Sequence, residues 1–370
     1  METPSLMNIV LFTSSSNTSG GARQALYLAR GLASRGHSVS FFVPASSALP
    51  SLDPDFPFRF LPVSVSAWKK TLTEALPASE PAVLHSFHNA ALKLLALFDI
   101  FRKKPLVTLA HRGVIFRPKN PLPYWSPGID HFTVNSLRCA AILRGFGLSA
   151  KRISYVPNAI PDERVAIRPN PELTRARLNI PADVPLFLCI SGDAKYKGVS
   201  VLMRAFAKAF PADSPQSPRL LIAGLIQDWR PLLSELGMEN SIRCLGYTED
   251  VGSLLRMADA FVLPSLQESM PNTLLEALRV GLPCIGTRVG GVPDVIGDAR
   301  ADPAGLLVAP GDVESLAFAL RALAEDPALR ARAADAALRR GNLFTQEKRL
   351  ERMEDIYRKL LQARGLLPRR

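Results

Sequence analysis

The residues best placed for chemistry lie in one short segment of the second half, from Pro264 to Leu278. A loop leads there into a predicted helix with Pro271 in its first turn, and proline early in a helix costs little because that position has no helical N–H partner. The amides of this turn and the helix dipole favour an anion, and a pyrophosphate would fit. Glu268 can accept hydrogen bonds from hydroxyls, and Glu276, about two turns along, can accept both hydroxyls of a ribose. A capped amphipathic helix with incidental glutamates is the alternative.

Two other loops that follow predicted strands offer groups for a phosphate. Lys195 and Lys197 follow the predicted strand 186–191, where two ammonium groups can neutralise a phosphate. Two solvated lysines are the alternative. Gly290 and Gly291 follow a later strand, and paired glycines allow the backbone to approach a ligand closely, although such a pair is more often a turn.

In the first half the main candidate is His111, which follows the predicted strand 106–110 and should therefore face the ligand. A lone histidine is more often structural, but its position at a strand end favours a functional role. His85 and His88 lie at another strand end with a weaker case. A basic cluster beside His111 either meets an anionic acceptor or is simply solvated: Arg112, Arg117 and Lys119.

Two successive series of strands and helices must position these groups. The strand 8–13, the helix 22–34 and the strand 39–43 read as a βαβ unit, which requires a parallel sheet. A proline-rich stretch from Ala159 to Pro185, with a short helix at Glu172 to Leu178, separates the two series. The remaining strands are expected at 82–85, 106–110, 131–134 and 153–156, then at 186–191, 219–223, 242–245, 260–263, 283–287 and 306–308.

We therefore expect an α/β protein of two Rossmann-like, doubly wound domains that face each other across a cleft. The first domain covers 1–165 and the second 166–345, and residues 346–370 form a helix that packs back on the first domain. Ligands of such sheets bind at the carboxyl ends of the strands, so the active site should lie in the cleft.

Composition and cysteine usage indicate a cytoplasmic protein with a sizeable core. Of 370 residues, 47% are hydrophobic and 21% charged, which excludes disorder and allows two domains. The four cysteines form no C-x-x-C pair, so structural thiols in a reducing compartment are expected. The first residues lack a secretory-signal pattern, and no apolar run is long enough to span a membrane. We expect no Asp-x-Asp-like metal site, and therefore no catalytic Mg²⁺.

The net charge of +12 is unevenly placed. Residues 1–170 hold 19 Lys and Arg against 9 Asp and Glu, a balance of +10. This basic half predicts an anionic partner, and solubilising surface charge is the alternative. Trp68-Lys69-Lys70 and the segment from Phe98 to Lys104 place aromatic rings beside cations, which favours an anionic membrane surface if Phe98 and Phe101 are not core residues. Nucleic acid is disfavoured because the basic residues are not interleaved with stacking aromatics.

Together these motifs resemble the large family of retaining glycosyltransferases with the two-domain GT-B fold, group 4. The matching features are the two glutamates, the Pro-Ser before them, Gly290-Gly291, and the steps 281–283 and 305–312. The resemblance is specific over 246–312 and extends over nearly the whole chain.

The resemblance implies roles for individual residues. Glu268 would contact the donor sugar, Glu276 the nucleotide ribose, and Lys197 the phosphates. The residues at the helix start would contact sugar and phosphates: Ser269, Met270, Pro271, Asn272, Thr273 and Leu274. His111 would contact the donor sugar, and a flexible loop with Gly20 and Gly21 would lie near the phosphates and acceptor. The family usually has an arginine where this chain has Asp193, so Lys195 is the candidate second phosphate cation.

The implied reaction moves a sugar from a nucleotide diphosphate to an acceptor hydroxyl with retention at the anomeric carbon, in lipopolysaccharide or cell-surface glycan assembly. It needs no cofactor beyond the nucleotide-sugar co-substrate. The acceptor would be a saccharide or lipid-linked saccharide, and the protein would be cytoplasmic and peripheral on the inner face of the cell membrane. A nucleotide-sugar epimerase, a phosphorylase or a non-catalytic nucleotide-sugar-binding protein are the alternatives. The glutamate pair argues against the first, and the missing pyridoxal lysine motif against the second.

Overall fold

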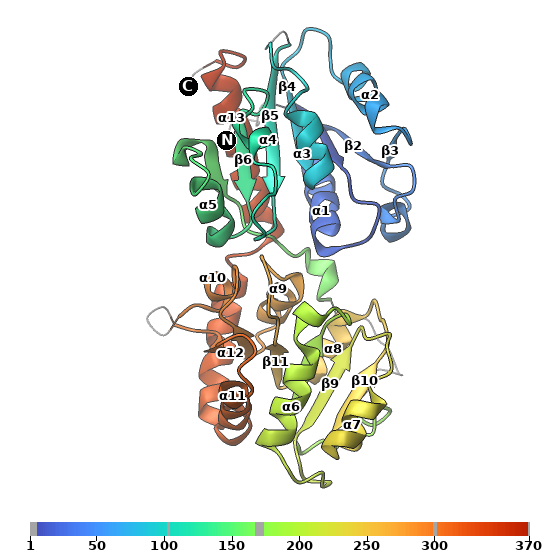
Figure 1. Ribbon diagram of the computed structural model, residues 1–370, viewed down its shortest axis with the longest axis vertical. Helices are drawn as coiled ribbons and strands as arrows, with labels where there is room; N and C mark the ends of the chain where they lie inside the picture. The colour runs from blue at the N-terminus through green and yellow to red at the C-terminus, as the bar shows by residue number, and fades with distance from the viewer. Residues whose placement is uncertain (1–5, 102–103, 167–173, 299–301, 369–370) are drawn as a thin grey trace. The chain divides into compact units, whose positions relative to one another are not determined.

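The computed structural model describes residues 6–101, 104–166, 174–298 and 302–368. The chain forms two compact units, Met1–Ala159 with Gln346–Arg370, and Ile160–Thr345. Each unit has its own parallel sheet flanked by helices (Figure 1), so the predicted α/β class with two Rossmann-like sheets is confirmed. The boundary falls at Ala159, earlier than the expected 165/166, and the C-terminal helix belongs to the first unit.

The first unit holds a seven-stranded sheet in the order β3-β2-β1-β4-β5-β6-β7, with every neighbouring pair parallel. Its strands are β1 (Asn8–Thr13), β2 (Ser38–Pro44), β3 (Phe58–Leu61), β4 (Ala82–Phe87), β5 (Leu106–Arg112), β6 (His131–Val134) and β7 (Ile153–Tyr155). The sequence analysis missed β3, a short edge strand whose Arg59 and Phe60 are exposed, so it carries no buried apolar run.

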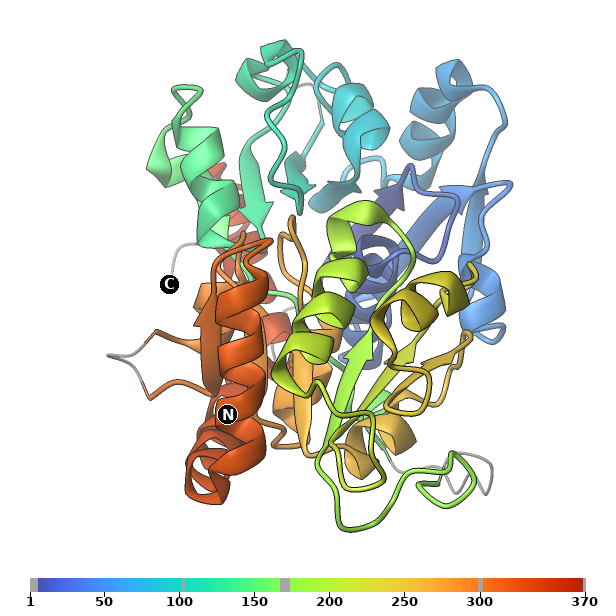
Figure 2. The same cartoon turned by 60° about the horizontal axis from the view of Figure 1, so that its bottom comes forward.

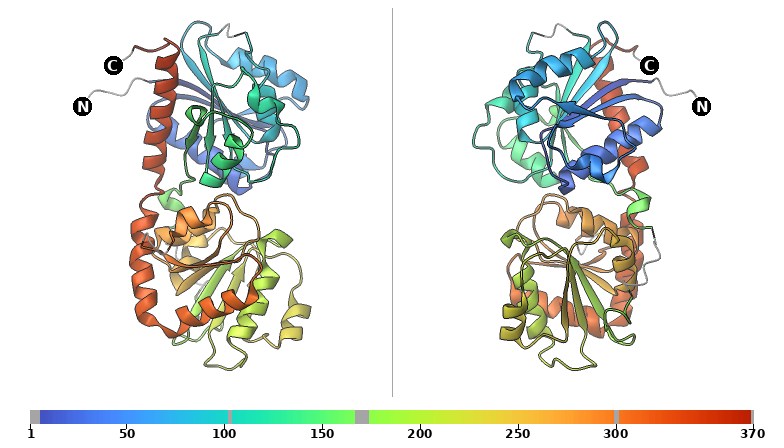
Figure 3. Two further views of the ribbon diagram at one scale, coloured as in Figure 1. Left: turned by 60° about the vertical axis from the view of Figure 1, so that its left-hand side comes forward. Right: turned by 90° about the vertical axis from the view of Figure 1, so that its right-hand side faces the viewer.

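Two layers of helices cover this sheet. They are α1 (Gly20–Ser34), α2 (Trp68–Ala75), α3 (Asn89–Leu95), α4 (Leu122–Trp125), α5 (Leu137–Arg144) and α13 (Gln346–Ala363). Strand residues alternate between the faces: Val83, Val107 and Leu109 pack with α1 and α13, whereas Leu84 and Ala110 pack with α2 to α5. Figure 3 shows α13 running along the first sheet, which places this last helix of the chain under the strands that carry the histidines.

The second unit holds a six-stranded sheet in the order β10-β9-β8-β11-β12-β13, again all parallel. Its strands are β8 (Leu186–Ile190), β9 (Arg219–Ala223), β10 (Ile242–Leu245), β11 (Ala260–Leu263), β12 (Cys284–Thr287) and β13 (Gly305–Val308). All six predicted strands are present with small shifts at their ends. The strand β8 lies at the centre, where the order reverses, which is the usual place for a ligand in such sheets.

The helices of the second unit are α6 (Val199–Ala209), α7 (Arg230–Leu236), α8 (Val251–Met257), α9 (Asn272–Arg279), α10 (Val292–Ile296), α11 (Val313–Glu325) and α12 (Pro327–Gly341). Helices α6 and α11 lie side by side on one face and share a core with β8 and β9 (Figure 2). The prediction of a helix at Glu172 to Leu178 is wrong over 174–178, which forms a bend and turns. The first two residues of the predicted helix lie outside the described residues. No helix among the described residues is long and apolar enough to cross a membrane.

Candidate functional site

Three loops come together after the neighbouring strands β8, β11 and β12 of the second sheet. The central loop carries Glu268 and is tied to both of its neighbours. The Leu266 amide donates to the Tyr196 carbonyl over 2.7 Å, and the Gly291 amide donates to the Ser269 carbonyl over 2.6 Å. The Thr287 hydroxyl donates to the Ser265 carbonyl as well. Backbone contacts from both sides therefore set the position of the glutamate loop.

Gly198 and Gly290 make this arrangement possible. A Cβ at Gly198 would lie 2.1 Å from the Pro264 carbonyl oxygen, and a Cβ at Gly290 would lie 1.6 Å from the Glu268 carbonyl oxygen. Both have positive φ, 72° and 54°. The sequence left the Gly290-Gly291 pair open between close approach of a ligand and a turn, and at Gly290 the group that approaches closely is the Glu268 loop. A side chain there would meet the backbone of the Glu268 loop.

Lys197 and Glu268 form an ion pair inside these loops. The lysine ends a 3₁₀ turn, Lys195–Lys197, after β8, and its Nζ lies 3.1 and 3.2 Å from the two carboxylate oxygens of Glu268. Their side chains are 26% and 13% exposed, so the pair is partly screened from water. The structure thus brings together the expected phosphate cation and the expected sugar-binding carboxylate.

Lys195 and Asp193, in the same loop after β8, do not take part in this ion pair. Lys195 is exposed, and its Nζ forms no ion pair with the residues that the structure describes. Asp193, where the family usually has an arginine, accepts hydrogen bonds from the Ile226 amide (2.7 Å) and the Trp229 indole (2.9 Å). It therefore holds the loop after β9, a task that an arginine at this position could not perform.

Helix α9 begins after Pro271 with no side-chain cap, so its N-terminal end relies on other partners. Met270 and Leu274 have buried side chains, which leaves only their backbone for contact with a ligand. Asn272 and Thr273 are half-buried on the first turn. The N-terminal end of α9 directly follows the Glu268 loop, and the helix dipole favours negative charge there.

Glu276 lies two turns along α9 and is 3% exposed. Its Oε1 accepts from Nε of Arg164 at 3.1 Å. Arg164 ends a short 3₁₀ turn, Asp162–Arg164, and the sequence analysis did not single it out. No local signal could have found it, because 112 residues separate the two partners. Arg279, one turn further along α9, pairs with Asp162 of the same turn, so two ion pairs fasten this turn to α9.

In the first unit, His111 lies inside β5 rather than after it, at the carboxyl end of the strand. Its Nδ1 lies 3.0 Å from the Thr133 hydroxyl on β6. Burial, and to a lesser extent Arg349 and His88, lower the pKa of His111 to about 3. The ring is thus neutral at pH 7, and Gly113 leaves room beside Nε2, where a Cβ would come within 3.1 Å. Arg112 of the adjacent basic cluster is buried and donates to Tyr124 and the Phe116 carbonyl, so it serves the structure rather than an acceptor.

Gly20 and Gly21 form the first turn of α1, with Ser19 as its cap, and not a flexible loop before the helix. A Cβ at Gly21 would lie 3.0 Å from Nε2 of His88. His88 has a φ of 71°, and its Nδ1 lies 2.8 Å from the Thr13 hydroxyl at the end of β1. The glycine therefore admits the imidazole ring to the carboxyl end of β1, which the sequence pattern did not reveal.

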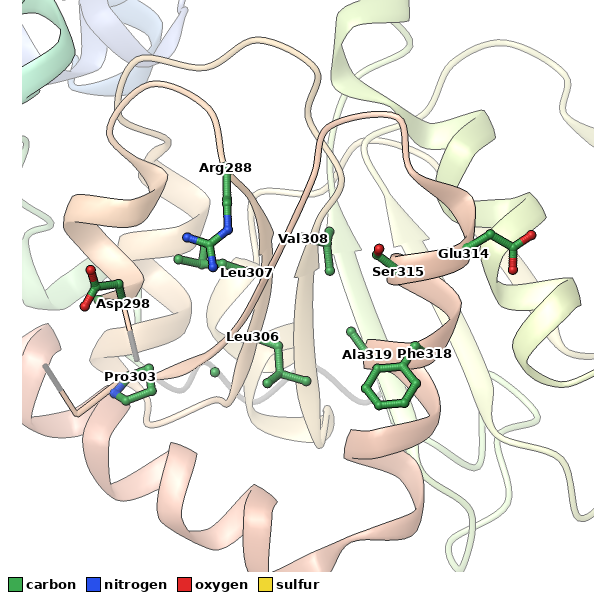
Figure 4. Close-up of a pocket in the computed structure, with 12 residues that line it drawn as sticks. Arg288, Asp298, Pro303, Leu306, Leu307, Val308, Glu314, Ser315, Phe318 and Ala319 are labelled. Atoms are coloured by element: carbon green, nitrogen blue, oxygen red, sulfur yellow. The ribbon is translucent and has the colours of Figure 1, made fainter. Parts of the chain in front are cut away.

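Among the described residues no group of three or more His, Cys, Asp or Glu is arranged to hold a metal ion. The expectation of no Asp-x-Asp-like metal site overlooked Asp53 and Asp55, which form such a sequence, but Asp53 pairs with Arg30 at 3.1 Å. A cavity of about 550 Å³ lies beside β13 and α11, between Arg288, Leu306 and Phe318 (Figure 4). None of the candidate residues lines it.

Family comparisons cover both units. A model for "Glycosyltransferase Family 4" matches residues 18–164, and a model for "Glycosyl transferases group 1" matches residues 171–340. Together they include every candidate residue. The boundary between the two matches lies close to the boundary between the two structural units.

Curated relatives match over the chain only in part. An exopolysaccharide phosphotransferase of Streptomyces coelicolor is 30% identical over 66% of this chain and 25% of that protein. The N-acetyl-alpha-D-glucosaminyl L-malate synthase of Bacillus anthracis is 33% identical over 56% and 54%. The lipopolysaccharide core biosynthesis glycosyltransferase LpsD of Rhizobium meliloti is 32% identical over 45% and 46%. The chain thus spans about half the length, or less, of the curated relatives it matches.

Solved structures match over nearly the whole chain. HepE of Anabaena, solved in complex with UDP, has a TM-score of 0.81 at 16% identity, covering 95% of this chain and all of that one. At this identity the likeness shows the fold. From the two family matches and this fold, the chain belongs to glycosyltransferase family 4 and has the GT-B fold.

Proposed function

We propose that this protein transfers a sugar from a nucleotide-diphosphate donor to an acceptor hydroxyl, with retention at the anomeric carbon, in the assembly of lipopolysaccharide or another cell-surface glycan. The observation that carries the proposal is the Lys197–Glu268 ion pair beside the N-terminal end of α9, after neighbouring parallel strands. A cation, a helix N-terminus and a carboxylate in one place can bind the diphosphate and a hydroxyl of the sugar together.

In the proposed reaction the bond between the anomeric carbon and the diphosphate oxygen breaks, and a bond to the acceptor oxygen forms on the same face. The acceptor proton passes to the leaving phosphate oxygen. Charge develops on the diphosphate as the bond breaks, so Lys197 and the amides at the start of α9 lower the barrier by stabilising it. Glu268 holds the donor sugar, Glu276 the ribose, and His111 contacts the sugar. No metal takes part in this scheme, because Lys197 supplies the positive charge.

The names of the relatives support the pathway. One is a lipopolysaccharide core biosynthesis glycosyltransferase and another an exopolysaccharide phosphotransferase. Exposed apolar side chains beside lysines on the first unit support an acceptor at an anionic membrane surface, with the protein peripheral on its inner face. The apolar side chains are Leu97 and Phe101, and the lysines are Lys69 and Lys70. Trp68 and Phe98, which the sequence analysis grouped with them, are buried core residues, and Arg102 and Lys103 lie outside the described residues.

The experiment is a donor panel. Thermal-shift measurements with UDP-, GDP- and ADP-sugars identify the nucleotide, because a ligand at 100 times its Kd stabilises by about 2.7 kcal/mol. Turnover is then measured with saccharide and lipid-linked acceptors, and NMR of the product gives the anomeric configuration. Donor binding without transfer or hydrolysis would favour a non-catalytic binding protein. Conversion of the donor into its epimer would favour the epimerase.

A further inference from the structure

A continuous chain of buried hydrogen bonds links His111 to the C-terminal helix. His111 Nδ1 lies 3.0 Å from the Thr133 hydroxyl, and the same hydroxyl lies 3.3 Å from Nε2 of His85. On the other side of its ring, Nδ1 of His85 lies 2.7 Å from the hydroxyl of Tyr357 on α13. Thr133 and His85 are at most 1% exposed and Tyr357 is fully buried. The chain therefore runs through the core and becomes partly exposed only at His111.

The alternation of strand residues explains why these groups meet. Val107, Leu109 and His111 point to the same face of the sheet, and so do Val83 and His85 on the neighbouring strand. Thr133 pairs in register with His111. This face is covered by α13, whose Met353 and Tyr357 pack in the same core. The last helix of the chain thus reaches groups at the carboxyl ends of β4 to β6.

The direction of these hydrogen bonds follows from the need of each buried proton for an acceptor. If Tyr357 donates to His85 Nδ1, then His85 Nε2–H donates to Thr133, and the Thr133 hydroxyl donates to His111 Nδ1. Every buried proton then has an acceptor, and His111 carries its own proton on Nε2 at the partly exposed end. In the opposite direction the buried hydroxyl proton of Tyr357 has no acceptor among the described residues, which costs about 1–3 kcal/mol.

We propose that Tyr357, through His85 and Thr133, holds His111 in the tautomer that presents an N–H donor at Nε2. This tautomer is a property of the protein without any ligand. Its consequence rests on the proposed function: the N–H donates to an oxygen of the donor sugar, and the opposite tautomer would present a lone pair there. Tyr357, His85 and Thr133 are then positioning residues, and the C-terminal helix takes part in substrate recognition without touching the substrate.

Burial keeps the members of this hydrogen-bond chain neutral. Burial, followed by His111, Arg349 and His131, lowers the pKa of His85 well below its ordinary value. Burial raises the pKa of Tyr357, and Arg349 opposes this in part. Both imidazoles are therefore neutral and the phenol is protonated. A neutral imidazole carries its proton on only one of its two nitrogens, so His111 has a defined tautomer.

The test uses the intact protein with ¹⁵N-labelled histidine and two-dimensional NMR of the side-chain nitrogens at pH 7. His111→Gln and His85→Gln variants assign the signals. We expect wild-type His111 and His85 both to carry their proton on Nε2. Thr133→Val should shift His111 toward the Nδ1–H form and leave His85 unchanged, since Tyr357 still donates to it. Tyr357→Phe, which keeps the ring, should change both histidines, and Thr133→Ser should restore the wild-type pattern.

Ser154→Ala is the matched control, because it removes a hydroxyl that lies 2.8 Å from Nε2 of His131, outside the chain. It should leave His85 and His111 unchanged. Wild-type His111 protonated on Nδ1, or a Tyr357→Phe variant with both tautomers intact, would overturn the inference.

Kinetics separate this inference from the proposed function. With an active donor, Thr133→Val and Tyr357→Phe should lower kcat about two- to tenfold with nucleotide affinity unchanged, the usual range for one hydrogen bond. Unchanged kcat with shifted tautomers would overturn the contact between His111 and the sugar and leave the tautomer control supported. A wild type inactive on every donor would count against the proposed function, and the NMR result would still decide the tautomer of His111.

Discussion

Nζ of Lys197 lies 3.1 and 3.2 Å from the two carboxylate oxygens of Glu268, so the cation proposed for the diphosphate is already paired with the carboxylate proposed for the sugar. A bound diphosphate would compete with Glu268 for the same ammonium group. Each residue therefore influences the task of the other: Glu268 lowers the net positive charge offered to the phosphates, and Lys197 decides whether Glu268 is free to accept a sugar hydroxyl.

The ion pair predicts that substitutions of Lys197 and of Glu268 change nucleotide affinity in opposite directions. Lys197→Met should weaken binding of the nucleoside diphosphate by about 1.5–3 kcal/mol, because it removes a charged hydrogen bond and leaves Glu268 facing the phosphates. Glu268→Gln should keep or strengthen that affinity and lower turnover. Lys195→Met is the comparison, and its exposed position limits the expected loss to under about 1 kcal/mol. Calorimetric titration measures all three, and weaker nucleoside diphosphate binding in Glu268→Gln would contradict the account.

Glu276 should govern the affinity for the nucleoside rather than for the sugar. Glu276→Ala removes the proposed ribose hydrogen bonds together with the contact to Arg164, so nucleotide and nucleotide-sugar should both bind more weakly by about 1.5–3 kcal/mol. Glu314→Ala removes an exposed carboxylate of the same unit and should change neither affinity. Equal nucleotide affinity in the wild type and in Glu276→Ala would exclude the ribose contact.

The glycine that fits against the Glu268 loop gives a test on stability. Gly290→Ala would place a Cβ against the Glu268 carbonyl and force alanine to a φ of 54°. The free energy of unfolding, measured by denaturant titration, should therefore fall by more than about 1 kcal/mol. Gly192→Ala is a matched control in a neighbouring loop, because a Cβ there meets nothing within 4 Å. If Gly290→Ala unfolds at the same denaturant concentration as the wild type, the close approach of Gly290 to the Glu268 loop is not present in solution.

The strands were predictable because buried parallel strands are continuous apolar runs separated by helical patterns, and twelve of them were placed close to their final bounds. The edge strand β3 escaped because only Leu61 in it is fully buried. The glutamate loop was also recognisable, since its residues are contiguous.

The partners within the site could not be found in the same way. Arg164 meets Glu276, Tyr357 meets His85, and Glu268 meets Lys197 across separations of 112, 272 and 71 residues, and none of these pairs leaves a periodic trace in the sequence. The partner of Gly290 was also not predictable from the sequence. The residue type indicated a close approach, but only the fold identifies the backbone of Glu268 as what approaches it.

Activity should survive removal of divalent metal. The motivation is that Lys197 lies where a cation is needed for the leaving diphosphate and that Asp53 of the Asp-x-Asp sequence is paired with Arg30. Initial rates with the preferred donor should be equal with excess EDTA and with added Mg²⁺ or Mn²⁺. Loss of all activity in EDTA, with recovery on adding metal, would show that the lysine is not a sufficient cation and that the metal expectation is wrong.

Attachment to an anionic membrane should depend on one region of the first unit. Leu97 and Phe101 are 65% and 83% exposed, and Lys69 of α2 donates to the Leu97 carbonyl at 3.2 Å, which brings an exposed lysine to these apolar side chains. Near an anionic surface each lysine contributes about 1 kcal/mol within a Debye length, and buried apolar side chains add to it. The protein should therefore sediment with anionic liposomes at low salt and much less at high salt.

The decisive comparison is between two charge reversals of equal size. Changing Lys69, Lys70 and Lys104 to glutamate, together with Phe101→Ser, should abolish sedimentation with anionic liposomes. Changing Lys208, Arg332 and Arg339 of the second unit to glutamate alters the net charge by the same amount and should have little effect, since a membrane surface recognises where the charge lies as well as its sum. If both variants lose binding equally, the attraction is a property of net charge alone. If the wild type does not sediment at low salt, a soluble saccharide becomes the better acceptor, because nothing would then hold the protein at a lipid-linked one.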